Sequence, residues 1–267
     1  MTSEAITSKH RLIQITDPHI GGRQDYQLLG LDTGHTFDEV LNSVAAEPHK
    51  AELMIVTGDV SANGSEDAYR RYLRKIQAFP IPWFWLPGNH DNPARMDQLA
   101  PRRRPEVASI GNWRLLLLDT SVRGQICGGF DEGELARIEV LLEQYADHPL
   151  MLMMHHQPVP VGSNWIDGHM LREGRDRFIE LVTAAKQVRA IAWGHVHQQF
   201  DESLGDIGLH ATPSTSVQFT PGSGPFSVDS EMPGYRWFEL NDDGSYETGV
   251  ERVHISEYSV DLASSGY

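Results

Sequence analysis

The segment "FWLPGNHDN" (84–92) joins a hydrophobic run to a polar cluster with only a Pro-Gly pair between them. Two aromatic residues and a leucine predict a buried strand. An asparagine, a histidine and an aspartate, Asn89, His90 and Asp91, follow it directly. A turn accounts for the glycine and the asparagine, but it does not account for the histidine. The segment therefore predicts a core strand whose carboxyl end carries functional side chains.

The same transition recurs along the chain. Apolar runs of strand length cover Arg11–Thr16, Leu53–Thr57, Trp83–Leu86, Trp113–Leu118, Leu150–Met154 and Val188–Trp193. Five of these runs are followed by ligand-type side chains: Asp17 and His19; Asp59; Asn89 and His90; His155 and His156; His195 and His197. Ligands of α/β sheets gather beyond the carboxyl ends of the strands, so we expect one shared site.

Each cluster alone is explained as well by a capped turn or by a histidine that bonds to the backbone. Structural turns, however, have no reason to prefer histidine and aspartate at five strand ends in succession, and the repetition favours function. Carboxylate, amide and imidazole ligands together suit Mn, Fe or Zn. The one cysteine, Cys127, leaves no Cys-based zinc motif and no internal disulfide.

Helical patterns lie between several of the predicted strands and cover Ser65–Gln77, Asp131–Tyr145 and Leu171–Ala185. The strand runs are continuous rather than alternating, as in strands covered on both faces. From Phe200 onward, turn residues separate short extended pieces at Gly208–Ala211, Ser216–Phe219 and Tyr235–Leu240, without a helix. This order predicts an α/β fold, with a second sheet in the last third of the chain.

Composition limits the partners. The formal net charge of -15 disfavours binding to nucleic acid and to anionic membranes. The amino terminus has no secretory signal, and the longest apolar stretches of about six residues are far below the ~20 that cross a bilayer. We expect a cytoplasmic protein without a membrane anchor, and the sequence carries no signal for its oligomeric state.

Taken together, the motifs D-x-H, G-D, G-N-H-D, H-H and G-H-x-H resemble the complete signature of the calcineurin-like metallophosphoesterases. Further segments resemble the bacterial class III 3′,5′-cyclic AMP phosphodiesterases of the CpdA type: Leu12–Asp17, Trp85–Asp91, Ser163–Leu171, Ala211–Phe219 and the closing "ASSGY". The resemblance implies an α/β (α+β) fold, an αββα sandwich of two mixed β-sheets flanked by helices. We expect residues 1–267 to form one domain, with a poorly ordered Ser-rich tail at 259–267.

The resemblance also implies two metal ions, expected to be Fe and Mn, with Zn as the alternative. By resemblance, one ion is held by Asp17, His19, Asp59 and His197, and the other by Asp59, Asn89, His155 and His195. Asp59 then bridges the pair, and such a carboxylate can hold two cations about 3.5–4 Å apart, close enough to clamp one phosphoryl group. The choice of His155 over His156 rests on the resemblance alone, so a supporting or a packing role stays open for His156.

The expected reaction is hydrolysis of 3′,5′-cyclic AMP to 5′-AMP by a hydroxide that bridges the two metals, which lowers cyclic AMP signalling. His90 is expected to protonate or stabilise the departing ribose oxygen, with Asp91 orienting it. The residues expected to contact the substrate are His19, Asp59, Asn89, His90, His197, Trp165 and Thr212. Two divalent ions less two carboxylates and a hydroxide leave a formal charge of about +1, which matches a phosphodiester monoanion.

Recognition of the base is less determined. Trp165, His169, Thr212, Ser214 and Phe219 lie in the subfamily-like segments and are candidates to line an adenine pocket. Trp165 and Phe219 are equally well explained as packing residues.

Two other functions stay open. One is a phosphodiesterase for another small diester, such as a glycerophosphodiester or a 2′,3′-cyclic nucleotide. The other is a non-catalytic scaffold of the same fold that binds a partner protein, which is disfavoured because every ligand position and His90 are filled. A phosphoprotein substrate is disfavoured too, because "GDVSANG" (58–64) lacks the arginine of the G-D-x-x-D-R-G string of protein Ser/Thr phosphatases.

Overall fold

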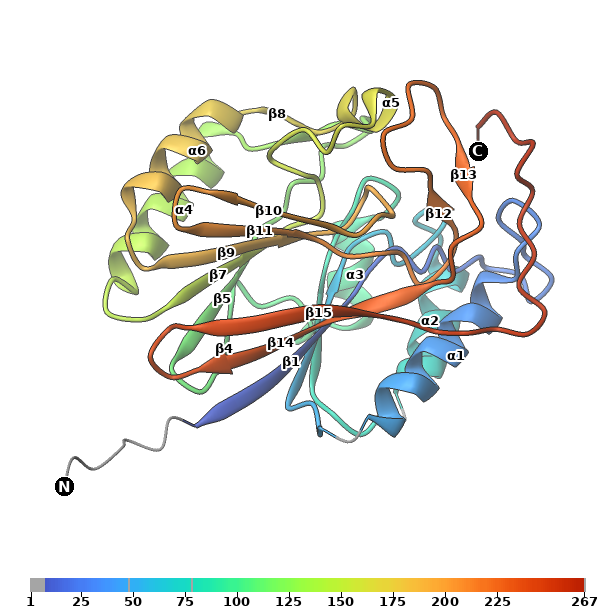
Figure 1. Cartoon of the computed structure of the whole chain (residues 1–267), viewed down its shortest axis with the longest axis horizontal. Helices are drawn as coiled ribbons and strands as arrows, with labels where there is room; N and C mark the ends of the chain where they lie inside the picture. The colour runs from blue at the N-terminus through green and yellow to red at the C-terminus, as the bar shows by residue number, and fades with distance from the viewer. Residues whose placement is uncertain (1–7, 48, 78, 267) are drawn as a thin grey trace.

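Two β-sheets pack face to face, and helices cover the outer face of each (Figure 1). The structure is a computed structural model that describes residues 8–47, 49–77 and 79–266. The first sheet has the order β15 (Tyr246–Arg252), β14 (Gly234–Asn241), β1 (Lys9–Ile15), β2 (Leu53–Thr57), β3 (Trp83–Leu86). The second has the order β10 (Phe200–Leu204), β11 (Ile207–Ala211), β9 (Val188–Trp193), β7 (Leu150–Met153), β5 (Trp113–Leu117), β4 (Val107–Ile110).

Both sheets are mixed. In the first, β1, β2 and β3 are parallel and β14 pairs with β1 in the antiparallel direction. In the second, β5, β7, β9 and β11 are parallel, with antiparallel β4 and β10 at the edges. Two short ribbons pair β12 (Gln218–Phe219) with β13 (Val228–Asp229) and β6 (Gly128–Gly129) with β8 (Leu171–Glu173). The predicted α/β fold of two mixed sheets flanked by helices is confirmed.

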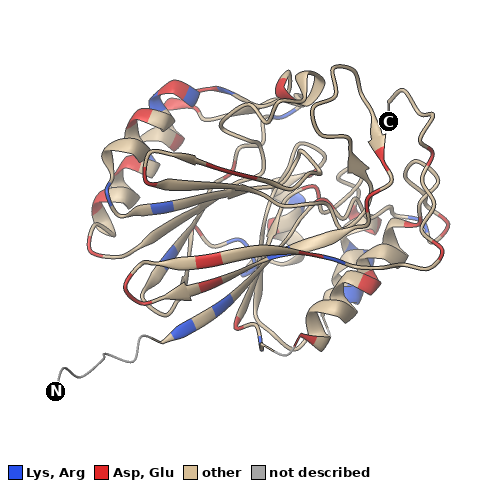
Figure 2. Ribbon diagram, in the orientation of Figure 1, with Lys and Arg blue, Asp and Glu red and all other residues tan. Residues whose placement is uncertain are grey.

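Six helices are found among the described residues: α1 (Thr33–Ala46), α2 (Glu66–Ile76), α3 (Pro93–Leu99), α4 (Glu132–Gln144), α5 (Asn164–Asp167) and α6 (Arg175–Ala184). Buried side chains of α1, α2 and α3 pack on the first sheet, and those of α4 and α6 pack on the second. A third apolar cluster joins residues of both sheets, such as Ile55 and Phe238 with Trp113 and Met151. Charged residues lie mainly on the outer helices and the exposed strands (Figure 2).

One predicted helix begins later than expected. The segment predicted as helical from Leu171 begins as strand β8, and α6 starts only at Arg175. The amide of Leu171 donates to the carbonyl of Gln157 at 3.0 Å, so Leu171 bonds to the segment that follows β7 and not within a helix. Gly174 then adopts φ of 69°, a left-handed turn that favours glycine and resets the chain before the helix. The predicted helix therefore began about one turn too early in the chain.

Helix α1 was not among the predicted helices, although the sequence of 32–46 carries clear signals for it. Asp32 caps the helix by accepting bonds from the amides of Gly34 and His35. Phe37, Val40, Leu41 and Val44 then recur at helical spacing and are buried.

The carboxyl-terminal segment lies against the rest of the molecule where it is described, up to residue 266. The amide of Asp261 donates to the carbonyl of Leu29 at 2.8 Å, and Tyr258 and Val260 pack against an apolar cluster that includes Leu28 and Phe219. Throughout the described ranges, no helix is long and apolar enough to cross a membrane.

Candidate metal centre

The predicted ligand-type side chains meet at the carboxyl ends of five parallel strands. β1, β2 and β3 lead into Asp17 and His19, Asp59, and Asn89, while β7 and β9 lead into His155, His195 and His197. The loops are tied together by their backbones, as where the amides of Asp17 and His19 donate to the carbonyls of Gly58 and Asp59. All of these side chains except that of Asn89 are buried, at 5% exposure or less.

Backbone strain is concentrated in the same loops. Six non-glycine residues of the described chain have positive φ, and five of them are predicted ligands: Asp17, His19, Asp59, His195 and His197. Such conformations cost free energy and persist where the surroundings hold them, most often at functional sites. The strain turns each side chain inward at the end of its strand.

One group of possible ligand atoms comprises Asp17, His19 and His197. Nε2 of His197 lies 3.2 Å from Oδ1 of Asp17 and 3.2 Å from Nε2 of His19. The other carboxylate oxygen of Asp17, Oδ2, accepts bonds from the Thr16 hydroxyl at 2.6 Å and from the His195 amide at 3.0 Å. Oδ1 of Asp17 is therefore the oxygen that faces the two imidazoles.

A second group gathers around His155. Its Nε2 atom lies 3.2 Å from Oδ1 of Asn89 and 3.4 Å from Oδ2 of Asp59. The same Oδ2 atom of Asp59 lies 3.7 Å from Nε2 of His19, which belongs to the first group. A single carboxylate oxygen thus stands between the two groups, in the position of a bridging ligand.

The chemistry of these atoms fits metal binding. Nδ1 of His155 lies 2.8 Å from the Thr57 carbonyl, and Nδ1 of His197 lies 2.8 Å from the Val217 carbonyl. Because a carbonyl can only accept, these Nδ1 atoms carry protons and the Nε2 lone pairs point into the cluster. Nε2 of His195 and Oδ1 of Asp17 are buried without a hydrogen-bond donor or acceptor among the described residues. Buried polar atoms of this kind need a partner, and a cation would supply one.

Burial and neighbouring charges shift the pKa values of the ionisable groups in this cluster. Burial lowers the pKa of His19 to about 3 and holds the pKa of His195 well below its usual range. Burial alone would raise the pKa of Asp59, but His155 and His90 bring it well below its usual range. Burial likewise opposes the charge of His155, yet Asp59 raises its pKa to about 9. Metal binding requires a neutral imidazole, so a cation held by Nε2 of His155 would favour the form of His155 that is protonated on Nδ1 alone.

At two positions before predicted ligands, Gly58 and Gly88, neighbouring atoms leave no space for a side chain. A Cβ atom on Gly88 would lie 2.2 Å from Oδ1 of Asp59, and Gly58 has φ of 95° with the His155 ring 2.4 Å from its ideal Cβ position. These two turns therefore have no room for a side chain.

His90 stands at the edge of the cluster and is partly exposed. Its amide donates to Oδ1 of Asp59 at 2.9 Å, and its Nδ1 lies 3.0 Å from the carbonyl of Ala62. Nε2 of His90 lies 4.0 Å from Oδ2 of Asp59. The ring is therefore oriented by a backbone carbonyl and presents Nε2 toward the metal ligands.

Asp91 makes contacts other than those expected from the sequence. Its carboxylate accepts bonds from the amides of Val60, Ser61 and Gly88, each at 3.0 Å, and from the hydroxyl of Tyr69 at 2.9 Å. Burial and the nearby Asp59 raise its pKa to about 6 in spite of these donors. Asp91 thus fastens the loop after β3 to the loop after β2, and any influence on His90 passes through the backbone.

His156 makes hydrogen bonds through both of its ring nitrogens. Nδ1 of His156 lies 2.7 Å from the Thr120 hydroxyl, and Nε2 lies 2.9 Å from the Ile126 carbonyl. Both ring nitrogens have partners outside the ligand cluster, and the ring packs 4.6 Å from that of His195. These partners favour a supporting role, although His156 also lies with His155 and His195 in a group of side chains that could hold a metal ion.

The candidates for base recognition separate into two sets. Thr212 is fully buried and donates to the side-chain carbonyl of Gln14 at 2.7 Å, and Ser214 donates to the Asp17 carbonyl at 2.8 Å. Phe219 is buried and stacks on His197, with ring centroids 4.3 Å apart. These three side chains contact the ligand loops, and Thr212 is not among the residues that line the cavity beside the histidines.

Trp165 and His169, in contrast, line a cavity of about 440 Å³ together with Asn89, His90 and His195. Four residues that also line this cavity were not predicted from the sequence: Gln125, Ile126, Phe226 and Gly266. Gly266 lies in the closing "ASSGY" segment that resembles the CpdA type, and the other three lie outside the segments that carry the resemblance. A larger cavity of about 630 Å³ lies between α6 and the β10–β11 hairpin, away from the histidines.

Comparison with known proteins adds independent findings. Residues 10–199 match the family model described as calcineurin-like phosphoesterase. Among curated proteins, the 3′,5′-cyclic adenosine monophosphate phosphodiesterase CpdA of Pseudomonas aeruginosa is 38% identical, over 96% of this chain and 94% of that protein. The protein of the same name from Escherichia coli (strain K12) is 35% identical, with the same two coverages.

Solved structures resemble the fold. A dimetal phosphatase from Danio rerio superposes with a TM-score of 0.65 and 12% sequence identity, covering 92% of this chain and 99% of that one. GAP50 of Plasmodium superposes with a TM-score of 0.63 and 11% identity, covering 96% and 90%. At these identities the likeness extends to the arrangement of the sheets and helices.

Proposed function

Because the chain belongs to the calcineurin-like phosphoesterase family, we propose that it is a metal-dependent phosphodiesterase that hydrolyses 3′,5′-cyclic AMP to 5′-AMP. The names of the relatives at 38% and 35% identity support this substrate, since the alignments cover nearly the full length of both partners. The observation that carries the proposal is the position of Asp59, whose Oδ2 atom lies between the two groups of ligand atoms.

The proposed ligands follow the two groups. Asp17, His19, Asp59 and His197 hold one ion, and Asp59, Asn89, His155 and His195 hold the other. Imidazole, carboxylate and amide ligands without a thiolate support Fe and Mn as the pair, with Zn as the alternative. When bound, two such ions lower the pKa of water and neutralise charge that develops on a phosphoryl group.

The remaining chemistry is assigned to this chain's own side chains. Hydrolysis adds the oxygen of water to phosphorus and breaks the bond between phosphorus and the 3′ oxygen of the ribose. That oxygen leaves poorly as an alkoxide and needs a proton. His90 is suited to donate it, because the Ala62 carbonyl holds Nδ1 and leaves Nε2 facing the cluster. Asp91 positions His90 by holding the backbone on either side of the cleft.

The proposal also covers the domain organisation, the class of substrate and the cellular location. Residues 1–267 are proposed to form one domain, which the apolar cluster shared by both sheets supports. The substrate is a small molecule, and the net charge of -15 argues against nucleic acid as an alternative. A cyclic AMP substrate implies a cytoplasmic site of action and a part in ending cyclic AMP signalling.

The test is turnover of cyclic AMP by protein whose metal content has been measured, with and without a chelator. We expect hydrolysis that the chelator abolishes and that Mn²⁺ or Fe²⁺ restores. The same preparation is tested on glycerophosphocholine and on 2′,3′-cyclic AMP. A preference for 3′,5′-cyclic AMP in kcat/KM of less than about tenfold would contradict the substrate assignment.

A further inference from the structure

The cavity of about 440 Å³ beside the metal ligands has two chemically different parts. Asn89, His90 and His195 contribute polar atoms of the metal centre, and Trp165 and Phe226 contribute aromatic rings. One small ligand can therefore contact both parts at once. A charged phosphodiester suits the polar part, but it leaves the aromatic part without a function.

The aromatic part is built as a rigid wall. The Trp165 ring packs edge to face with Phe219 and with Phe226, at centroid distances of 4.9 Å in both cases. Phe219 in turn stacks almost parallel on the ring of His197, with an interplanar angle of 11°. The wall is therefore connected through direct ring contacts to a proposed metal ligand, which fixes its distance from the metals.

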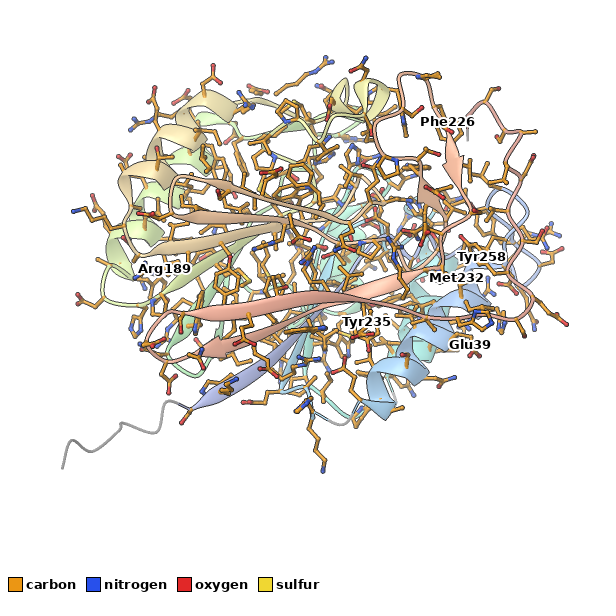
Figure 3. The ribbon with its side chains drawn as sticks, viewed as in Figure 1. Glu39, Arg189, Phe226, Met232, Tyr235 and Tyr258 are labelled. Carbon is orange, nitrogen blue, oxygen red and sulfur yellow. The ribbon has the colours of Figure 1, made fainter. Side chains whose placement is uncertain are left out.

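Three separate segments hold this wall in place. The amide of Asn164 donates to the carbonyl of Ser223 at 3.0 Å, and the amide of Gly222 donates to the hydroxyl of Ser163 at 3.0 Å. These bonds join α5, which carries Trp165, to the loop that carries Phe226. Figure 3 shows Phe226 on the approach to β13. Tyr258 of the carboxyl-terminal segment packs in the same apolar cluster, and Gly266 of that segment completes the cavity lining.

Further lining comes from the loop before β6. Ile126 is 54% exposed, a rare state for a large apolar side chain in this protein. Its carbonyl is held by His156 at 2.9 Å, so the residue is fixed although its side chain is open to solvent. Gln125 and His169 lie beside it in the lining and offer groups that can donate and accept hydrogen bonds. An exposed isoleucine, two aromatic rings and polar groups at the margin suit a flat heterocycle.

This inference rests on the proposed phosphodiesterase function: we propose that the cavity is a nucleobase subsite in which a purine stacks on Phe226, meets the Trp165 ring at its edge and contacts Ile126. The cyclic phosphate occupies the end lined by Asn89 and His90. Stacking of a base on an aromatic side chain is tolerant of base identity and contributes strongly to binding. A glycerophosphodiester has no flat apolar part and gains nothing from this wall, so the wall selects nucleoside diesters.

The test compares two substrates that share the cyclic diester. One is 3′,5′-cyclic AMP, and the other is the 3′,5′-cyclic phosphate of methyl ribofuranoside, which has no base. We expect Phe226→Ala to lower kcat/KM for cyclic AMP roughly tenfold while kcat/KM for the base-free diester changes less than about twofold. An equal fall on both substrates, or no fall on cyclic AMP, overturns the proposal.

A second variant avoids the packing that Phe226 shares with Trp165. Ile126→Ser removes a side chain that is mostly exposed and keeps the carbonyl that His156 holds, so we expect it to fold normally. It is expected to show the same selective loss on cyclic AMP. Leu262→Ala is the matched control, because Leu262 is 58% exposed and lies outside the cavity lining. A loss in this control equal to that of Ile126→Ser overturns the assignment.

Failure of the proposed function has a different signature. In that case the metal-loaded wild-type protein leaves both cyclic phosphates intact, and the subsite is tested by calorimetric binding of adenosine alone. Adenosine binding that Phe226→Ala weakens roughly tenfold supports the subsite without any turnover. Absence of adenosine binding to the wild-type protein overturns it.

Discussion

The carbonyl of Ala62 lies 3.0 Å from Nδ1 of His90, and this contact decides which nitrogen of His90 faces Asp59 and the neighbouring ligand-type side chains. The carbonyl can only accept, so Nδ1 carries a proton and Nε2 is directed toward Oδ2 of Asp59, 4.0 Å away. The orientation needed for proton donation is therefore built into the backbone of the loop after β2.

His90→Ala tests this role directly. Without a proton donor for the ribose oxygen, kcat for cyclic AMP is expected to fall at least about 100-fold, while both metals remain bound. Metal analysis and steady-state kinetics on the same sample check it, with His35→Ala as a control on an exposed histidine of α1. Unchanged turnover in a variant with full metal content would exclude His90 as the donor.

Asp59→Asn keeps the shape of the proposed bridge and removes its charge. We expect bound metal to fall below two ions per chain and turnover to be lost, because the oxygen that stands between the two ligand groups no longer carries the charge that attracts two cations. Elemental analysis of the purified variant measures this, and the exposed Asp67→Asn serves as the control. Two bound ions with normal turnover would show that another group bridges them.

His156→Gln tests whether His156 holds the loop that lines the cavity or contributes to metal binding. Loss of the bond from Nε2 to the Ile126 carbonyl loosens a wall of the cavity. KM for cyclic AMP is expected to rise by roughly three- to tenfold, which is the effect of one hydrogen bond, with little change in kcat. A fall in metal content that tracks the loss of activity would instead assign His156 to the ligands.

Asp91→Asn is expected to act on stability. The amide that replaces the carboxylate turns an N–H group toward at least one of the donors that Asp91 now accepts from, which are three backbone amides and the Tyr69 hydroxyl. The free energy of unfolding should fall by about 1–3 kcal/mol, measured by urea denaturation of the metal-loaded protein. Tyr69→Phe removes one of these donors and should cost less. A loss of turnover with unchanged stability would favour a direct catalytic role for Asp91.

The pH dependence of stability is expected to involve Asp201, outside the metal centre. Its Oδ1 atom lies 2.7 Å from Nδ1 of His210 and 2.8 Å from NH1 of Arg236, linking the second sheet to the first. Burial alone would raise the pKa of Asp201, but these two partners lower it to about 2. The folded pKa lies below the ordinary value of about 3.9. The stabilisation is therefore present above pH ~4 and is lost as the pH falls toward ~2.

Asp201→Asn removes this contribution, so its unfolding free energy should lie further below the wild type at pH 7 than at pH 3. Urea denaturation at both pH values provides the measurement. The exposed Asp206→Asn is the control, and both variants share any loss of metal at low pH. A difference from the wild type that is equal at the two pH values would contradict the assignment.

Local features of the sequence were enough to predict the strands and the ligands that end them. A run such as Leu53–Thr57 followed by Gly58 and Asp59 encodes both the strand and the turn that aims the carboxylate, because all of the required residues are neighbours in the chain. Parallel strands then bring their ends together whatever the rest of the chain does. The sandwich and the ligand cluster follow from this local pattern.

Only the tertiary structure decided how the other side chains are used. Thr212 bonds to Gln14, which lies 198 positions away, and His156 bonds to the Ile126 carbonyl, 30 positions away. Phe226 reaches the cavity from a loop that carries no motif. These contacts depend on how separate segments pack, and no local periodicity or spacing encodes that. The sequence by itself thus determined which ligand-type side chains follow the strands, and the packing decided which residues support them and which line the cavity.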